Sequence, residues 1–335
     1  VEALGAYGGA EAVKALALAR IQASGEMRTR IDGAMLRCAN AELQVGRKLQ
    51  AVRIYEMLYA DGQPLHLRIG ALKGLLRAQA DGAIDRLTAA LQSDNFQMQR
   101  EAIAMAPLAA APDATQAIVA VLPDLPAEVQ PLLLLALGER RDAAVLPALA
   151  RASESNEQAI RVAAIEAMRH FPQPEAIEIL GKIAATAEGE DQRAARSALR
   201  RLEGDNADRA MLSMLDSADP QVRTELIRAL AFRRAEGADD ELMKVARNAS
   251  DDAARLEAIQ GLGTLAGPEQ LKSMVALLVQ PKAPGDRAAV AEAIGDLFQR
   301  MENDEAKAGA LLATLNDSRT PAEAKPFLLR LLADP

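Results

Sequence analysis

The chain has 335 residues, of which half are hydrophobic and only 2% are aromatic, and it contains no tryptophan. Its 39 basic and 47 acidic side chains give a net charge of −8. That balance argues against binding to nucleic acid, because phosphate contacts need a basic surface. The single cysteine, Cys38, excludes an intramolecular disulfide framework and a zinc site built from several thiolates. No apolar run approaches the roughly 18 residues of a membrane-spanning helix, so we expect no membrane insertion.

Residues 1–66 are predicted to form irregular helical hairpins. Ala39 and Ala51 lie twelve residues apart, and Tyr55 follows four residues later. This spacing resembles a tetratricopeptide hairpin; the alternative is a longer version of the hairpin that is repeated further along the chain. Residues 1–25 are expected to be one half of a hairpin. Cys38 lies in an apolar helical pattern and is expected to be buried.

From residue 67 to residue 316 the sequence repeats with a period of 31 or 32 residues. One apolar position recurs at Leu75, Ala106, Leu137, Met168, Leu199, Leu230, Leu262 and Ile294. A second recurs at Leu87, Ile118, Leu149, Leu180, Met211, Leu242, Met274 and Ala306. Most members have a further apolar residue three or four positions away, which is typical of the buried stripe of a helix. Each unit is therefore predicted to be two amphipathic helices, with the first set of positions almost fully buried.

Glycine, proline and aspartate separate the predicted helices, as in Ala80-Asp81-Gly82, Ala111-Pro112-Asp113 and Asp219-Pro220. An aspartate before a helix accepts hydrogen bonds from its free N–H groups. Residues 317–335 are predicted as a C-terminal half-repeat with a lone helix over 322–332. Because no strand-like alternation occurs, the sequence predicts an all-α fold, a right-handed α-α superhelix of about nine to ten helical hairpins.

The units resemble HEAT repeats. The Asp219-Pro220 opening, the Val222-Arg223 pair and the Leu262-Gly263 ending match the short bacterial variety first described in phycobilisome lyases, over roughly Leu65 to Leu332. The array is also similar to HEAT regions of large exported proteins from planctomycete-type bacteria. That resemblance implies a piece of a larger protein, and it favours a periplasmic or exported location over a cytoplasmic one. The repeat itself specifies no function, because it serves many tasks.

An arginine recurs early in the first helix of several units, at Arg68, Arg161, Arg223, Arg255 and Arg287. This row has two interpretations, an anion-binding ladder or contacts between repeats. We favour the second, in which each arginine bonds a carboxylate or carbonyl of an inter-repeat loop, with Asp219 and Asp251 among the candidates. The row is irregular: Gln130 replaces the arginine in one unit, and Arg100 and Arg193 are displaced by one residue.

No motif for catalysis, a cofactor or a metal is predicted. His66 and His170 lie 104 residues apart and are expected at the surface or in loops. We therefore expect no enzymatic activity. The alternative is a HEAT-like enzyme, similar to a bilin lyase or a DNA glycosylase. A glycosylase needs a basic, aromatic cleft for an extruded base, and eight aromatic residues with a charge of −8 count against one.

The favoured function is a non-catalytic scaffold that binds a protein or peptide. The HEAT resemblance implies that the second helices line the concave side. Positions two residues before and after their apolar lane are i and i+4 neighbours on the exposed face. The charged residues predicted to bind a partner there are Arg151, Glu178, Lys182, Arg209, Asp240, Lys244 and Lys272. The rival location is the irregular N-terminal hairpin, residues 27–66, which contains Tyr55 and Tyr59.

Overall fold

The computed structural model describes residues 1–333, apart from the side chains of Ala6, Tyr7 and Asp304. Over these residues the secondary structure is helical, with no strand, which confirms the predicted all-α class. The first helices are α1 (Glu2–Tyr7), α2 (Ala10–Gln22), α3 (Gly25–Gln44), α4 (Lys48–Tyr59), α5 (Leu65–Arg77), α6 (Ala83–Leu91), α7 (Phe96–Met105), α8 (Ala114–Val121), α9 (Gln130–Glu139), α10 (Leu146–Ala152) and α11 (Gln158–Ala167). The others are α12 (Pro174–Thr186), α13 (Gly189–Arg200), α14 (Ala207–Met214), α15 (Pro220–Arg233), α16 (Ala238–Asn248), α17 (Asp252–Leu265), α18 (Leu271–Val279), α19 (Asp286–Arg300), α20 (Asp304–Asn316) and α21 (Lys325–Ala333).

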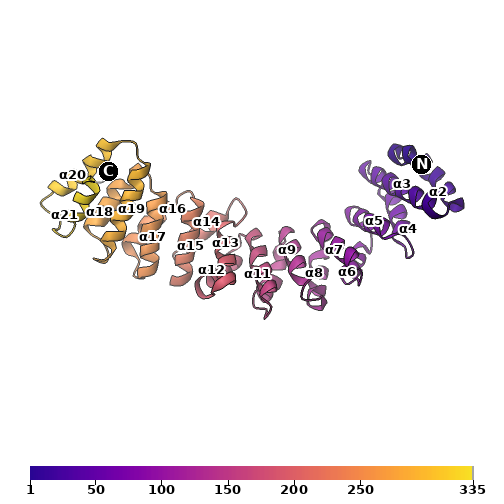
Figure 1. Ribbon diagram of the computed structural model, residues 1–335, viewed down its shortest axis with the longest axis horizontal. Helices are drawn as coiled ribbons and strands as arrows, with labels where there is room; N and C mark the ends of the chain where they lie inside the picture. Colours follow the sequence, from indigo (N-terminus) through magenta and orange to yellow (C-terminus); the bar gives the residue numbers. More distant parts are fainter. Residues whose placement is uncertain (334–335) are drawn as a thin grey trace. The chain divides into compact units, whose positions relative to one another are not determined.

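The chain forms two compact units, Val1–Ala167 and Met168–Pro335. Within each unit, short helices follow one another in chain order (Figure 1). First and second helices alternate: α5/α6, α7/α8 and α9/α10 in the first unit, and α13/α14, α15/α16, α17/α18 and α19/α20 in the second. The predicted division at residues 66 and 316 and the predicted right-handed superhelix stay predictions.

The repeat register is confirmed by burial. Leu75, Leu137, Met168 and Leu230 are 0% exposed, and Leu199 and Leu262 are 1% exposed. The lane of the second helices is likewise buried from Leu87 to Met274. Its last member, Ala306, is exposed, contrary to prediction. In α20, the last second helix, Leu311 is the buried residue instead, so the apolar face is rotated there.

Polar residues begin several helices as expected. The Asp219 carboxylate accepts a hydrogen bond from the Gln221 amide at 2.9 Å, and the Asp251 carboxylate accepts one from the Ala254 amide at 2.7 Å. Each bond satisfies an N–H group that has no partner within its own helix. Asn95 performs the same role for α7.

The two ends differ in detail from the prediction. Residues 1–25 contain two helices rather than one, because Gly8 and Gly9 both adopt positive φ angles, 67° and 88°, and interrupt the helix. At the other end, α21 begins at Lys325 rather than at residue 322, because the preceding residues form a turn closed by a bond from the Ala324 amide to the Pro321 carbonyl. The predicted C-terminal half-repeat extends to residues 334 and 335, which lie outside the described residues.

Candidate functional site

The seven predicted partner-binding residues are all exposed and all lie on second helices. Arg151 is on α10 in the first unit. The other six lie in the second unit: Glu178 and Lys182 on α12, Arg209 on α14, Asp240 and Lys244 on α16, and Lys272 on α18. The second unit therefore carries a series of charges in register with its repeats.

Two of the lysines are neutralised by acids on their own helices. Lys182 forms an ion pair with Glu178 at 2.6 Å, one turn away. Lys244 pairs at 2.6 Å with Glu241, and this hydrogen bond raises the pKa of the Lys244 ammonium. Among residues 1–333, no ion-pair partner is found for Arg151, Arg209 or Lys272, so Arg209 and Lys272 are the uncompensated cations of the row in the second unit.

Lys272 borders a groove between α18 and α20. Its cavity volume is about 560 Å³. Val275, Ala276, Val279, Ala310 and Ala313 form the apolar part of its lining.

The groove also has a polar part of its lining. Asp317 and Arg319 lie there and pair at 2.7 Å, an interaction that lowers the pKa of the Asp317 carboxyl to about 2. The lining of the groove therefore combines an apolar surface with the Lys272 ammonium and an ion pair.

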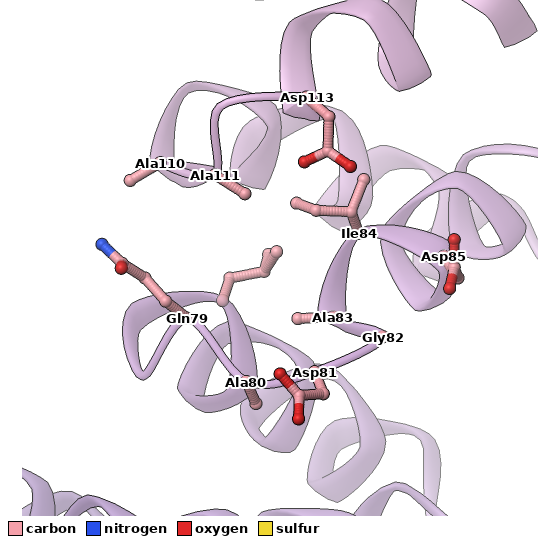
Figure 2. A pocket seen from close by; sticks show the side chains of 11 residues that line it. Gln79, Ala80, Asp81, Gly82, Ala83, Ile84, Asp85, Ala110, Ala111 and Asp113 are labelled. Carbon is pink, nitrogen blue, oxygen red and sulfur yellow. The ribbon is translucent and has the colours of Figure 1, made fainter.

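A smaller cavity of about 250 Å³ lies in the first unit, between the loops that join α5 to α6 and α7 to α8. Figure 2 shows the Asp113 side chain directed towards Ile84, while Asp85 lies on the other side of the α6 start. Asp113 belongs to the predicted helix-breaking segment Ala111-Pro112-Asp113, whereas Asp85 lies in the first turn of α6. The described residues contain no group of three or more His, Cys, Asp or Glu placed to hold a metal ion.

The recurring arginines bond the neighbouring repeat. Arg161 donates to the Ser155 and Asn156 carbonyls at 2.9 and 3.1 Å, between α10 and α11. Arg223 donates to the Leu215 and Asp216 carbonyls, and Arg255 donates to the Ala249 carbonyl. The predicted contacts with the loops between repeats are thus confirmed. The kind of acceptor that all three arginines have in common is a backbone carbonyl. Asp219 and Asp251 cap helices instead.

The row of inter-repeat donors is more regular than the sequence pattern suggested, because glutamine replaces arginine at three positions. The donors are Arg68, Gln99, Gln130, Arg161, Gln192, Arg223, Arg255 and Arg287. In the same order, their acceptors are the carbonyl oxygens of Tyr59, Leu91, Leu125, Ser155, Ala184, Leu215, Ala249 and Val279. Every acceptor lies near the end of the preceding second helix. We call these eight residues the carbonyl ladder.

The carbonyl ladder corrects the sequence interpretation of Arg100 and Arg193 as displaced members. Gln99 and Gln192 hold the regular positions, whereas Arg100 and Arg193 are exposed. A side-chain amide supplies the same N–H donor as a guanidinium. The sequence signal that identifies these residues is an arginine or a glutamine that recurs every 31 or 32 residues.

The Gln99→Ala variant is expected to lose about 1–2 kcal/mol of unfolding free energy, because it leaves the Leu91 carbonyl without its 2.9 Å side-chain donor. The matched control is Arg100→Ala, whose exposed side chain points elsewhere and whose loss should cost less than about 0.5 kcal/mol. Urea unfolding followed by circular dichroism measures both. Equal effects of the two substitutions would contradict the assignment of Gln99 to the carbonyl ladder.

A second set of arginines, which the sequence analysis missed, fastens the ends of first helices to one another. Arg140 donates to the Ala106 and Ala109 carbonyls at 2.6 and 2.7 Å. Arg233 donates to the Arg200 and Leu202 carbonyls at 3.0 and 2.9 Å, which ties α15 to the end of α13. Arg300 bonds the Gly263 and Ala266 carbonyls in the same manner. Cations suit these positions because a helix C-terminus carries partial negative charge.

Ion pairs add to these contacts in the second unit. Arg196 on α13 binds Glu225 on α15 through two hydrogen bonds, at 2.9 and 2.8 Å. Arg228 bonds the same Glu225 and also Glu257 on α17. The charged groups therefore connect three consecutive first helices. Since Glu225 is only 5% exposed, its two guanidinium partners compensate a nearly buried charge.

The tyrosines of the N-terminal hairpin contact other parts of the fold. Tyr55 is 0% exposed, so it is not the surface residue that the rival site requires. Its hydroxyl donates to Asn40 at 2.8 Å, and burial raises its pKa to about 12. Tyr59 is half-buried, with the Arg68 and Arg86 guanidinium groups 5.3 and 6.0 Å from its ring centroid.

The remaining candidates for chemistry lie apart. Cys38 is 0% exposed, as expected, and burial raises the pKa of its thiol. His66 is exposed on α5, whereas the His170 ring, largely buried in the turn before α12, lies 3.0 Å from Glu203. No helix among residues 1–333 has the length and apolar character needed to cross a bilayer.

Comparison with known proteins agrees with this architecture. The family model for HEAT repeats matches residues 115–200 and 209–295, together more than half of the chain. Comparison with curated protein sequences finds no match.

Solved structures with a similar fold include human deoxyhypusine hydroxylase in complex with glycerol, at 20% identity over 77% of this chain and 99% of that one, with a TM-score of 0.35. Kap121p is 11% identical over 96% of this chain and 43% of its own, with a TM-score of 0.43. The complex of CpcE and CpcF of phycocyanin lyase from Nostoc sp. PCC7120 is 17% identical over 75% of this chain and 93% of that one, with a TM-score of 0.33. The buried repeat register and the family match together show that the chain belongs to the HEAT-repeat proteins.

Proposed function

We propose that the chain is a non-catalytic scaffold that binds an acidic protein or peptide on the exposed face of its second helices. The observation that carries the proposal is the pair of exposed cations Arg209 and Lys272, which have no ion-pair partner among the described residues. In contrast, Arg161, Arg223 and Arg255 of the carbonyl ladder bond the fold itself. Because Arg209 and Lys272 form no ion pair among the described residues, their charges are available to bind a partner.

The groove beside Lys272 supports a peptide as the bound chemistry. Its apolar lining residues, which include Val275 and Ala313, accommodate aliphatic side chains. Lys272 lines the same groove, so its ammonium group attracts a carboxylate of the bound peptide. Such a combination of apolar contact and a few charges is typical of peptide recognition. We further propose that the repeats are of the phycobilisome-lyase type and that the array is part of a larger exported protein, a proposal that rests on the sequence resemblance alone.

The test is a charge reversal of the two unpaired cations. We expect the Arg209→Glu/Lys272→Glu variant to bind a fluorescent peptide of alternating Glu and Leu roughly tenfold more weakly, because complementary charges contribute to affinity and to the rate of encounter. Fluorescence anisotropy across a salt series measures the effect, which should shrink as salt screens the charges. Unfolding should be unchanged, since exposed substitutions cost within about 0.5 kcal/mol.

Two further variants sharpen the result. Glu178→Lys/Glu241→Lys releases Lys182 and Lys244 from their ion pairs and should strengthen binding of the same peptide. Lys182→Glu/Lys244→Glu should weaken it. If all these variants bind like the unmodified chain while Tyr59→Ala does not, the binding site lies in the N-terminal hairpin and the proposal is wrong.

A further inference from the structure

A basic and aromatic pocket lies between two first helices of the second unit. Arg193, Arg196, Arg200 and Arg201 line one side, on or just after α13, and Phe232 on α15 lines the other. The cavity volume is about 470 Å³. Both walls belong to the same compact unit, and α13 and α15 are neighbours in Figure 1. We call this surface the arginine pocket.

The arginine pocket has more positive charge than the fold requires. Arg196 is neutralised by Glu225, as described above. No ion-pair partner is found in the described chain for Arg193, Arg200 or Arg201. Several acids of the second unit are engaged elsewhere: Glu225 and Glu257 bind Arg228, and Asp208 binds Arg233. Three guanidinium groups without an ion-pair partner among the described residues therefore line one pocket, in a chain with a net charge of −8.

Phe232 adds an apolar contact surface to these charges. Its side chain is 61% exposed, although it belongs to a helix whose buried face is formed by other residues, among them Leu226 and Leu230. The Arg200 guanidinium lies 4.7 Å from its ring centroid, a cation–π distance that holds the ring and the charge side by side. An exposed aromatic ring next to arginine is typical of the residues that dominate protein interfaces.

The two walls are held at a fixed spacing by contacts already described. Arg233 of α15 bonds the carbonyls of Arg200 and Leu202, and Arg196 of α13 bonds Glu225 of α15. A site built on linked helices keeps its geometry without a partner, which lowers the entropy cost of binding.

We propose that the arginine pocket binds an acidic peptide segment of a partner protein. Aspartate or glutamate carboxylates pair with Arg193, Arg200 and Arg201, because guanidinium and carboxylate groups match in planar, bidentate geometry. An apolar side chain of the same segment packs on Phe232. A nucleic acid is disfavoured, because three cations supply few phosphate contacts and the remaining chain is acidic. This surface is formed by first helices, so it is independent of the function proposed for the second helices.

The experiment uses the Arg209→Glu/Lys272→Glu variant of the full chain as the reference, so that the surface of the second helices is disabled. The probe is a fluorescent 12-residue peptide containing four glutamates and one leucine, and its control has glutamines in place of the glutamates. We expect measurable, salt-sensitive binding of the acidic peptide and loss of roughly tenfold in affinity on adding Arg193→Glu/Arg201→Glu. Phe232→Ala should weaken binding roughly fivefold without changing the salt dependence.

Matched controls separate this pocket from general positive charge. Arg100→Glu/Arg247→Glu reverses two exposed arginines elsewhere and should leave the affinity unchanged. Equal affinity for the acidic and the glutamine peptide would overturn the proposal, and so would tighter binding of single-stranded DNA than of the acidic peptide. If the chain self-associates and the Arg193→Glu/Arg201→Glu variant does not, the occupant of the pocket is a second copy of the chain and the proposed partner protein is wrong. If the charge reversal of Arg209 and Lys272 has no effect on peptide binding, the outcomes for the arginine pocket can still be interpreted, because the charges of both residues are already reversed in the reference variant.

Discussion

The Asp286→Ala variant is expected to lose about 3–5 kcal/mol of unfolding free energy, because it leaves a buried guanidinium without its main counter-charge. The side chains of Arg255 and Asp286 are 3% and 4% exposed, and their closest atoms, Nε and Oδ2, are 2.6 Å apart. The Asp286 carboxylate also accepts a hydrogen bond from the Ala283 amide at 3.0 Å. Removal of the carboxylate therefore breaks two kinds of contact at the start of α19. Thermal and urea unfolding of the full chain measure the change.

The matched control for this prediction is Asp252→Ala. Asp252 pairs with the same guanidinium at 2.8 Å, but its side chain is 81% exposed. Solvent screens an exposed pair, so its loss should cost only about 0–1 kcal/mol. A comparable destabilisation by both substitutions would show that burial of the Arg255–Asp286 pair is not what matters.

The Gly74→Ala variant is expected to destabilise the first unit by about 1–3 kcal/mol, although alanine normally favours a helix. A Cβ atom at this position would lie 2.3 Å from Cε1 of the Tyr55 ring. The ring cannot move aside cheaply, since it is fully buried and its hydroxyl is bonded to Asn40. The substitution therefore forces α4 and α5 apart.

Gly33→Ala is the control for this effect. Gly33 lies within α3 of the same unit, and the nearest atom to an added Cβ is the Arg37 Nη1 atom at 3.9 Å. Here the helix preference acts without a clash, so we expect stabilisation of up to about 1 kcal/mol. The pair of variants gives opposite shifts of the urea midpoint if the Tyr55 contact is correct, and shifts of the same sign if it is not.

The positions of the buried lanes could be predicted from the sequence because burial in a repeat depends on spacing alone. Leu137 and Leu230, for example, are fixed by the period of the pattern. The carbonyl ladder could be predicted only in part. A search for a recurring arginine identifies Arg223. It does not identify Gln99, because Gln99 supplies the same N–H donor from a different type of side chain.

The candidate surfaces were predictable to a smaller extent. Exposure of Lys182 and Lys244 follows from their spacing to the buried lane, but their ion pairs with Glu178 and Glu241 depend on rotamers that the pattern does not specify. The arginine pocket needs α13 and α15 side by side, with Phe232 turned outwards. Such a placement arises from the packing of two helices within the second unit and leaves no periodic signal in the chain.

The carbonyl ladder has a consequence for the growth of such arrays. Each donor finds its acceptor within nine residues or fewer of chain, from nine for Arg68 and Tyr59 down to five for Gln130 and Leu125. Donor and acceptor therefore stay together in a repeat-length segment that is cut between the first and the second helix of a repeat, because the inter-repeat loop and both of its flanking helices remain in one piece. Tandem duplication of that segment therefore copies a complete ladder contact, whereas the contacts between successive first helices, such as Arg196 with Glu225, require matching residues in two repeats.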